Sequence, residues 1–114
     1  MNTWDVILLR FPFGDGTDVK KRPAVVISKN EYHNSGQDGL FLLVTSNLDR
    51  SAHYDVPIPV SHPEYRFTGL RVASCIRVDK IMNLSNTLVV RTLGNLGEGL
   101  KREVREKLAE LIKI

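Results

Sequence analysis

The chain has 114 residues, of which 42% are hydrophobic and 25% charged, which fits one globular domain over residues 1–114 and excludes a disordered tail or a multidomain enzyme. A formal net charge of +3 and a pI near 9.2 favour a polyanionic partner without requiring one. The lone Cys75 excludes an internal disulfide, and the histidines show no metal-ligand spacing. The early apolar run is too short for a signal peptide or a membrane span, so we expect a cytoplasmic protein with no membrane contact.

Short β-rich runs separated by turn residues make up most of the chain. Seven runs are predicted to be strands, over residues 4–11, 24–28, 40–45, 54–58, 72–78, 80–84 and 88–93. Turn-forming residues gather between them, at 13–18, 34–39, 46–53 and 61–69. Several strands are continuous apolar runs, which indicates burial on both faces by a closing barrel or by a partner. So many short strands in so small a chain predict a small β-barrel.

The hydrophobic period changes only at the end of the chain. In the stretch LKREVREKLAELIKI, residues 100–114, the apolar side chains of Leu100, Val104, Leu108, Leu111 and Ile112 recur at helical spacing, with charged residues opposite. The fold class is therefore mainly β with a C-terminal α-helix. Acidic residues on the polar face disfavour contact with anionic lipid, so we expect this helix to pack on the barrel rather than to bind a membrane or a partner.

Three cations, Lys20, Lys21 and Arg22, stand directly before Pro23 in the stretch DVKKRPAVVISKN. Proline fixes its own φ, has no N–H to donate, and pushes the preceding Arg22 toward an extended backbone. The segment therefore suits the start of a strand. Two interpretations stay open: the cations bind an extended anionic ligand, or they form a solvated charge cluster that protects a strand edge from aggregation.

Several motifs follow one another in a recognisable order. They are W-x-V-x-L-L-x-F-P-F from residue 4, a glycine-rich loop, K-K-R-P-A-V-V-I-S from residue 20, L-V-T-S-N from 43, T-G-L from 68, R-V-D-K-I from 77 and the final amphipathic helix. In this order and spacing the chain resembles the MazF/PemK toxins of type II toxin–antitoxin systems. The resemblance implies an SH3-like, CcdB/MazF-type small β-barrel that forms a homodimer. It also implies an mRNA interferase, an endoribonuclease that cleaves single-stranded RNA at specific sequences without the ribosome.

The resemblance further implies a protein partner. Toxins of this family are neutralised by a cognate antitoxin, which we expect to fold on binding and to cover the RNA groove. The toxin–antitoxin complex would then bind DNA through the antitoxin. The free toxin would inhibit growth by cleaving RNA in the cytoplasm.

The family's catalytic arginine and threonine match Arg22, in the R-P step, and Thr45, in L-V-T-S-N. RNA supplies its own nucleophile in the 2′-OH, so the protein has to position the phosphate and stabilise the charge that develops on its oxygens. Arg22 offers a planar fork of donors, and Thr45 offers a hydroxyl. A guanidinium stays protonated near neutral pH, so we expect Arg22 to stabilise charge rather than to take a proton. We expect no metal ion and no cofactor.

PemK-type members also use an arginine and an aspartate, which match Arg77 and Asp79 in R-V-D. Asp79 would orient Arg77, contact a base or act as general base, and the alternative is a structural salt bridge at a strand end. The first loop lacks the histidine that some PemK-type members carry there, so the general base stays unassigned. Asp15 and Asp18 lie in that loop, where aspartates more often form turns.

Candidate RNA-binding residues lie beside these positions. Two precede Arg22 and four follow Thr45: Lys20, Lys21, Ser46, Asn47, Arg50 and His53. Cations would contact phosphates, and the polar side chains would hydrogen-bond unstacked bases. The alternatives are solvated charge for the lysines and turn formation for the residues after Thr45.

Two other functions remain open. The first is a catalytically weak or inactive module of the same barrel that binds RNA or protein, against which the intact Arg22 and Thr45 argue. The second is a CcdB-like inhibitor of DNA gyrase. Such inhibition depends on C-terminal residues, typically a tryptophan, whereas the single tryptophan here is Trp4.

Overall fold

The computed structural model describes residues 1–11, 20–49 and 52–113. Its strands are β1 (Asp5–Phe11), β2 (Lys20–Val26), β3 (Asp38–Thr45), β4 (Asp55–Ile58), β5 (Ser74–Ser85) and β6 (Val89–Asn95). Its helices are α1 (Asn30–Ser35) and α2 (Glu98–Leu111), with short 3-10 turns η1 (Tyr65–Phe67) and η2 (Asn86–Leu88). The strands form one antiparallel sheet in the order β4-β5-β3-β2-β1-β6.

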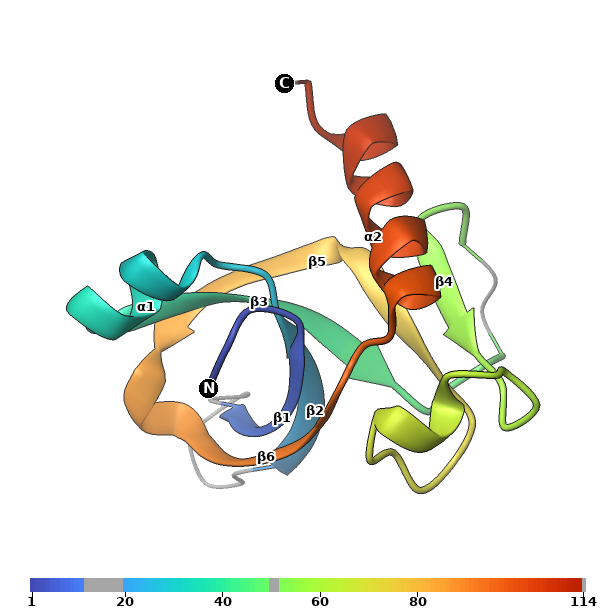
Figure 1. Ribbon diagram of the computed structural model, residues 1–114, viewed down its shortest axis with the longest axis horizontal. Coiled ribbons are helices and arrows are strands. Elements are labelled where there is room, and N and C mark those ends of the chain that lie inside the picture. Colours follow the sequence, from blue (N-terminus) through green and yellow to red (C-terminus); the bar gives the residue numbers. More distant parts are fainter. Residues whose placement is uncertain (12–19, 50–51, 114) are drawn as a thin grey trace.

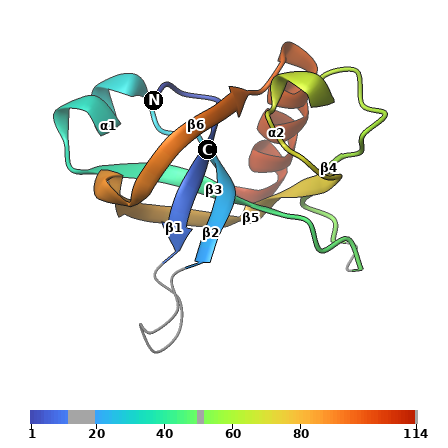
Figure 2. The ribbon, with the colours of Figure 1, turned by 90° about the horizontal axis from the view of Figure 1, so that it is seen from below.

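The predicted fold class is confirmed. The sheet is strongly curved, and α1 and α2 lie at opposite ends of it (Figure 1). Figure 2 shows β1 and β2 running side by side between β6 and β3. In the described part of the chain β4 and β6 are the two edges of the sheet, so it curls like a barrel without closing.

The prediction of seven strands was wrong, because the runs at 72–78 and 80–84 belong to the single strand β5. The register of β5 with β3 shifts between Leu42 and Leu43. This bulge bends the strand without ending it. In the sequence, the polar residues Asp79 and Lys80 at the bulge look like the end of one strand and the start of another. In the structure, β5 pairs with β3 on both sides of them.

Helix α1 was not predicted. Its sequence, NEYHNS, is too short and too polar to show a helical period. A tertiary contact anchors it, because His33 is buried and its Nδ1 lies 2.8 Å from the Ser28 hydroxyl oxygen. Short helices of this kind depend on packing rather than on intrinsic propensity.

Alternating side chains build two hydrophobic clusters, one on each face of the sheet. The first, which α2 covers, contains Val6, Val25, Leu42, Val44, Val56, Ile58, Leu70, Ile76, Val78, Leu96, Leu100 and Val104. The second contains Ile7, Leu9, Phe11, Ala24, Val26 and Phe41, with η2 and the far half of β5 packed against it.

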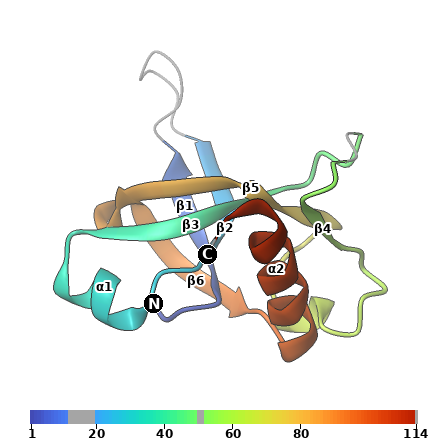
Figure 3. The ribbon, with the colours of Figure 1, turned by 90° about the horizontal axis from the view of Figure 1, so that it is seen from above.

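Helix α2 packs on the sheet as predicted for the amphipathic segment. Figure 3 shows it lying against β4 and β5, and Leu100 and Val104 are fully buried in the first cluster. Within the described residues, neither helix combines the length and the apolar content needed to cross a bilayer.

The first turn of α2 is capped from outside the helix by Glu64. The Glu64 carboxylate accepts hydrogen bonds from the N–H groups of Gly99, at 2.8 Å, and Leu100, at 2.7 Å, two of the amides that a helix start leaves unpaired. Burial raises the pKa of Glu64, but these two hydrogen bonds and the nearby charges of His62 and Arg102 outweigh it, so the pKa lies below its ordinary value.

Glu64→Ala is expected to lower the free energy of unfolding by about 1 kcal/mol at neutral pH, the usual scale of a lost helix cap. Because the folded-state pKa of Glu64 is lowered from 4.5, its contribution is present above that pH and is lost as the pH falls through the lowered value. Urea unfolding of both proteins at neutral pH and near pH 3 should therefore show that the difference in free energy of unfolding between wild type and Glu64→Ala is smaller in acid. Glu106→Ala, at an exposed position of the same helix, is the control. An equal loss in both variants would contradict the cap.

Candidate functional site

Three of the predicted catalytic residues project from one face of the sheet. Ala24 of β2 lies opposite Leu43 of β3, and Leu43 lies opposite Arg77 of β5. Residues paired across strands share a face, and side chains alternate along each strand. Arg22 and Thr45, each two residues from this row, therefore project from the same face as Arg77. They lie where the second hydrophobic cluster ends.

Arg77 is held between two carboxylates. Its Nη2 lies 3.6 Å from Asp79 Oδ1, and its Nε lies 4.0 Å from Asp55 Oδ1. The side chains of Arg77 and Asp55 are only 14% and 9% exposed, so solvent screens this contact less than it screens a surface pair. Asp79 is placed to orient Arg77, one of the roles predicted for it. Asp55 is a second carboxylate partner that the sequence did not indicate.

The Thr45 hydroxyl is oriented by the turn that follows β3. Its Oγ1 accepts the N–H of Asn47 at 3.0 Å, and the Asn47 side-chain oxygen accepts the N–H of Asp49 at 3.1 Å. One lone pair of Thr45 is thus engaged, while its O–H proton can still donate to an incoming acceptor. Asn47 forms a turn, which is one of the two roles considered for it.

Pro23 interrupts the sheet beside these residues. β2 pairs with β1 from Lys20 to Val25, but it pairs with β3 only from Ala24 to Val26. Because proline has no N–H to donate, the ladder with β3 does not continue through Pro23. A pocket of about 390 Å³ opens at this point. The extended start of β2 predicted from the R-P step is confirmed, since the strand begins at Lys20.

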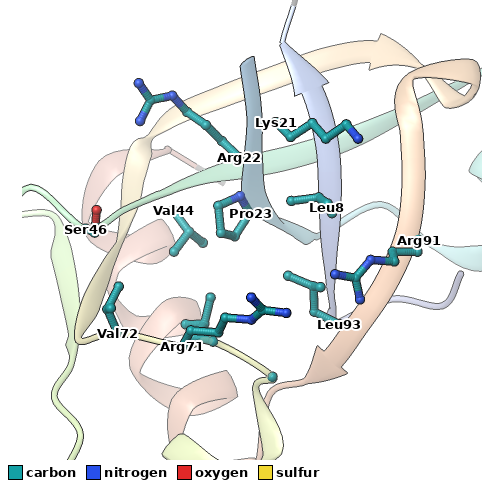
Figure 4. A pocket seen from close by; sticks show the side chains of 12 residues that line it. Leu8, Lys21, Arg22, Pro23, Val44, Ser46, Arg71, Val72, Arg91 and Leu93 are labelled. Atoms are coloured by element: carbon teal, nitrogen blue, oxygen red, sulfur yellow. The ribbon is translucent and has the colours of Figure 1, made fainter. Parts of the chain in front are cut away.

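The pocket has an apolar floor and a cationic rim (Figure 4). The floor is lined by Leu8, Pro23, Val44, Gly69, Leu70, Val72 and Leu93, and the rim by Lys21, Arg22, Arg71 and Arg91, with Ser46 at one end. Figure 4 shows the side chains of Lys21 and Arg22 leaving β2 in opposite directions. Arg22 therefore lines the edge of the cavity while its guanidinium points away from the other three cations, and we call the cavity the rim pocket.

The T-G-L motif forms one wall of the rim pocket. Gly69 has a φ of 71°, and a Cβ there would overlap the Leu93 carbonyl of β6. Gly94 makes the reciprocal approach, because its own Cβ would overlap the backbone at 67–68. Only glycine combines this backbone conformation with so close a contact. The two glycines seat the segment before β5 against β6, which brings Arg71 into the pocket that Arg91 lines.

The two predicted RNA-binding lysines lie on opposite faces of β2. Lys20 alternates onto the face of Arg22, whereas Lys21 lines the rim pocket. Ser46 also lines the rim pocket, directly after Thr45. The candidate residues grouped by sequence thus lie on two neighbouring surfaces.

His53 lies against α2 rather than in the rim pocket, with its Nε2 2.7 Å from Glu110 Oε2. Its side chain is 67% exposed. Arg50, Asp15 and Asp18 fall outside the described residues. Across the described ranges, no cluster of three or more histidine, cysteine, aspartate or glutamate side chains is arranged to hold a metal ion.

Asp55, Arg71 and Arg91 were missed by sequence reasoning. The first is a charged residue at the start of an apolar strand, which is a weak sign of a buried partner. The other two follow the T-G-L motif and interrupt the apolar run of β6. Nothing in the sequence relates them to one another, because the strand order and the Gly69 contact bring them together.

The sequence matches the family model of PemK-like, MazF-like toxins of type II toxin–antitoxin systems over residues 2–112. The chain belongs to this toxin family. The match spans both the Arg22 face and the rim pocket, and it confirms the family expected from the ordered motifs. No curated protein sequence matches the chain.

Solved structures of MazF toxins share the fold. MazF from Deinococcus radiodurans superposes with a TM-score of 0.75 at 22% identity, over 97% of this chain and 94% of that one. Mycobacterium tuberculosis toxin MazF-mt6 gives 0.74 at 14% identity, over 93% of each chain. A mycobacterial endoribonuclease in complex with its cognate antitoxin gives 0.73 at 16% identity, over 96% of this chain and 92% of that one. The predicted MazF-type barrel is confirmed by this likeness.

Proposed function

We infer that this chain is the toxin of a type II toxin–antitoxin system and acts as a sequence-specific endoribonuclease on single-stranded RNA. The family match supports the toxin assignment. The observation that carries the chemistry is the common face of Arg22, Thr45 and Arg77, which places two guanidinium groups and a hydroxyl donor at the end of one sheet. A phosphodiester bound there meets donors already held in position.

Cleavage uses the hydroxyl of the RNA itself. The 2′-oxygen gives up its proton and forms a bond to the adjacent phosphorus, the bond from phosphorus to O5′ breaks, and O5′ takes a proton. Arg22 and Thr45 donate to the phosphate oxygens, where negative charge develops in the transition state. Arg77, oriented by Asp55 and Asp79, adds positive charge without needing to move.

Mapping the ends produced from a long mixed-sequence RNA tests this function. We expect cuts at one short recurring word, because a toxin of this kind reads unstacked bases beside the cleaved phosphate. RNA that remains intact, while still bound by the protein, would favour the inactive binding module of the same barrel.

The protein partners are proposed on the same basis. Structures similar to this chain include a MazE–MazF complex from Deinococcus radiodurans and an endoribonuclease with its cognate antitoxin. We propose that this chain also binds a cognate antitoxin in the cytoplasm, and that the complex contacts DNA through the antitoxin. A homodimer is supported by exposed apolar side chains outside the rim pocket, among them Leu48, Val60 and Val90.

A gyrase inhibitor is the less favoured alternative. Trp4 packs against the first hydrophobic cluster, and the Arg105 guanidinium lies 5.2 Å from the centre of its ring. The single tryptophan is therefore part of the folded core region and is not presented from the C-terminal helix.

A further inference from the structure

We propose that the rim pocket binds a nucleotide next to the cleaved phosphate, with its phosphate on Lys21, Arg71 and Arg91 and its base on the apolar floor. This inference rests on the proposed nuclease function. It adds a subsite beside Arg22, which lines the edge of the pocket, and it brings in Arg71 and Arg91, to which neither the sequence motifs nor the family description gives a role.

Charge is the first argument. Arg71 and Arg91 come from segments far apart in the sequence, yet both line the pocket together with Lys21. No carboxylate lines the pocket, and none of these three cations forms an ion pair within the described part of the chain. Three like charges gathered in this way repel one another, so a bound anion would reduce the electrostatic repulsion that is present in the free protein.

The shape and lining fit a nucleotide. The cavity volume of about 390 Å³ lies within the usual range of small-ligand pockets. Leu8, Pro23 and Leu93 are half-buried, and Val72 is 55% exposed, so apolar surface remains open to a base. The planar guanidinium groups of Arg71 and Arg91 can either stack on a base or hydrogen-bond a phosphate. An ammonium group can contact the phosphate but has no planar surface to stack on a base.

Position favours RNA over an acidic protein segment. Lys21 adjoins Arg22 in β2, and Ser46 adjoins Thr45 after β3, so each side of the rim pocket is one residue from the proposed cleavage face. Neighbouring Cα atoms are about 3.8 Å apart. An RNA strand that crosses the open end of β2 and β3 would reach both sites with successive nucleotides, since Pro23 leaves that end without a ladder.

Binding of an uncleavable oligonucleotide tests the pocket. The probe is a mixed-sequence 2′-O-methyl RNA of about 12 nucleotides, within the range of single-strand site sizes, and it lacks the attacking hydroxyl. Arg71→Gln and Arg91→Gln should each weaken binding about fivefold and reduce the salt slope by about one unit. Both side chains are exposed, so the unfolding midpoint should stay at the wild-type value. Lys29→Gln removes the same charge at an exposed position beside α1 and should leave affinity unchanged.

Kinetics separate this pocket from the cleavage face. With a long RNA, Arg91→Gln should raise KM and leave kcat near wild type, because the pocket binds the substrate in both ground and transition states. Unchanged probe affinity in both arginine variants would overturn the proposal. The proposal would also be overturned if the two arginine variants bound a synthetic peptide of glutamate and leucine more weakly than wild type but kept wild-type affinity for RNA. That result would assign the pocket to an acidic protein segment. If wild type cleaves no RNA but the arginine variants still lose probe affinity, the nuclease function fails and the pocket stands.

Discussion

Arg22→Ala is expected to lower the rate of RNA cleavage by about 10²–10³, the scale for removing one preorganised donor from a transition state. The loss should appear in kcat, because the guanidinium is placed to meet charge that develops only as the phosphate reacts. The fold should persist, since β2 is held by backbone pairing with β1 from Lys20 to Val25. Single-turnover cleavage of a saturating RNA, together with thermal unfolding, measures both effects.

Two further variants sharpen this prediction. Arg22→Lys keeps the charge but loses the planar fork, so its rate should fall between those of wild type and Arg22→Ala. Thr45→Val removes the hydroxyl at nearly constant shape and should also lower kcat. Lys29→Ala, an exposed cation beside α1, is the control and should cleave at the wild-type rate. Full activity in both Arg22→Ala and Thr45→Val would show that the reaction occurs elsewhere.

The strands that carry the cleavage face could be predicted because their signals are local. Pro23 restricts the backbone on either side of it, and Thr45 ends an apolar run just before a turn. Period-two alternation then places side chains on a face once the register is known. The register itself was out of reach, because the Ala24–Leu43 and Leu43–Arg77 pairs join residues far apart in the chain.

Asp55 illustrates what local patterns cannot reveal. It opens β4, a strand at the edge of the sheet, and it meets Arg77 only because β4 pairs with the near half of β5. The bulge in β5, where the sequence pattern predicted two strands, lies between Arg77 and Ile81 and includes Asp79. A sequence pattern that reads those residues as a break therefore separates groups that the folded sheet holds together.

The rim pocket depends on backbone contacts rather than on side-chain patterns. Gly69 and Gly94 let the segment before β5 lie directly on β6, and this contact gathers Arg71 and Arg91. The T-G-L motif was visible in the sequence, but the partner of its glycine was not. Cations that look like scattered surface charge along the chain become a single rim in three dimensions.

A substrate with 2′-deoxyribose on the 5′ side of the cleaved phosphate is expected to bind but not to be cut. The proposed reaction has no other nucleophile, so removing that one oxygen should abolish cleavage while the phosphate contacts of Arg22 and the rim pocket persist. Affinity is measured with the deoxy substrate itself, and cleavage is compared with the all-ribose RNA of the same sequence under the same conditions.

The products and the effect of chelation test the same mechanism independently. Attack by the 2′-oxygen leaves a 2′,3′-cyclic phosphate on one fragment and a 5′-OH on the other, whereas water activated by a metal ion commonly leaves a 5′-phosphate. The charge that a metal would neutralise is met here by Arg22 and by Arg77, which Asp55 and Asp79 hold in place, so cleavage should continue in excess EDTA. Cleavage of the deoxy substrate, or activity that stops on chelation and yields 5′-phosphate ends, would refute the 2′-OH mechanism.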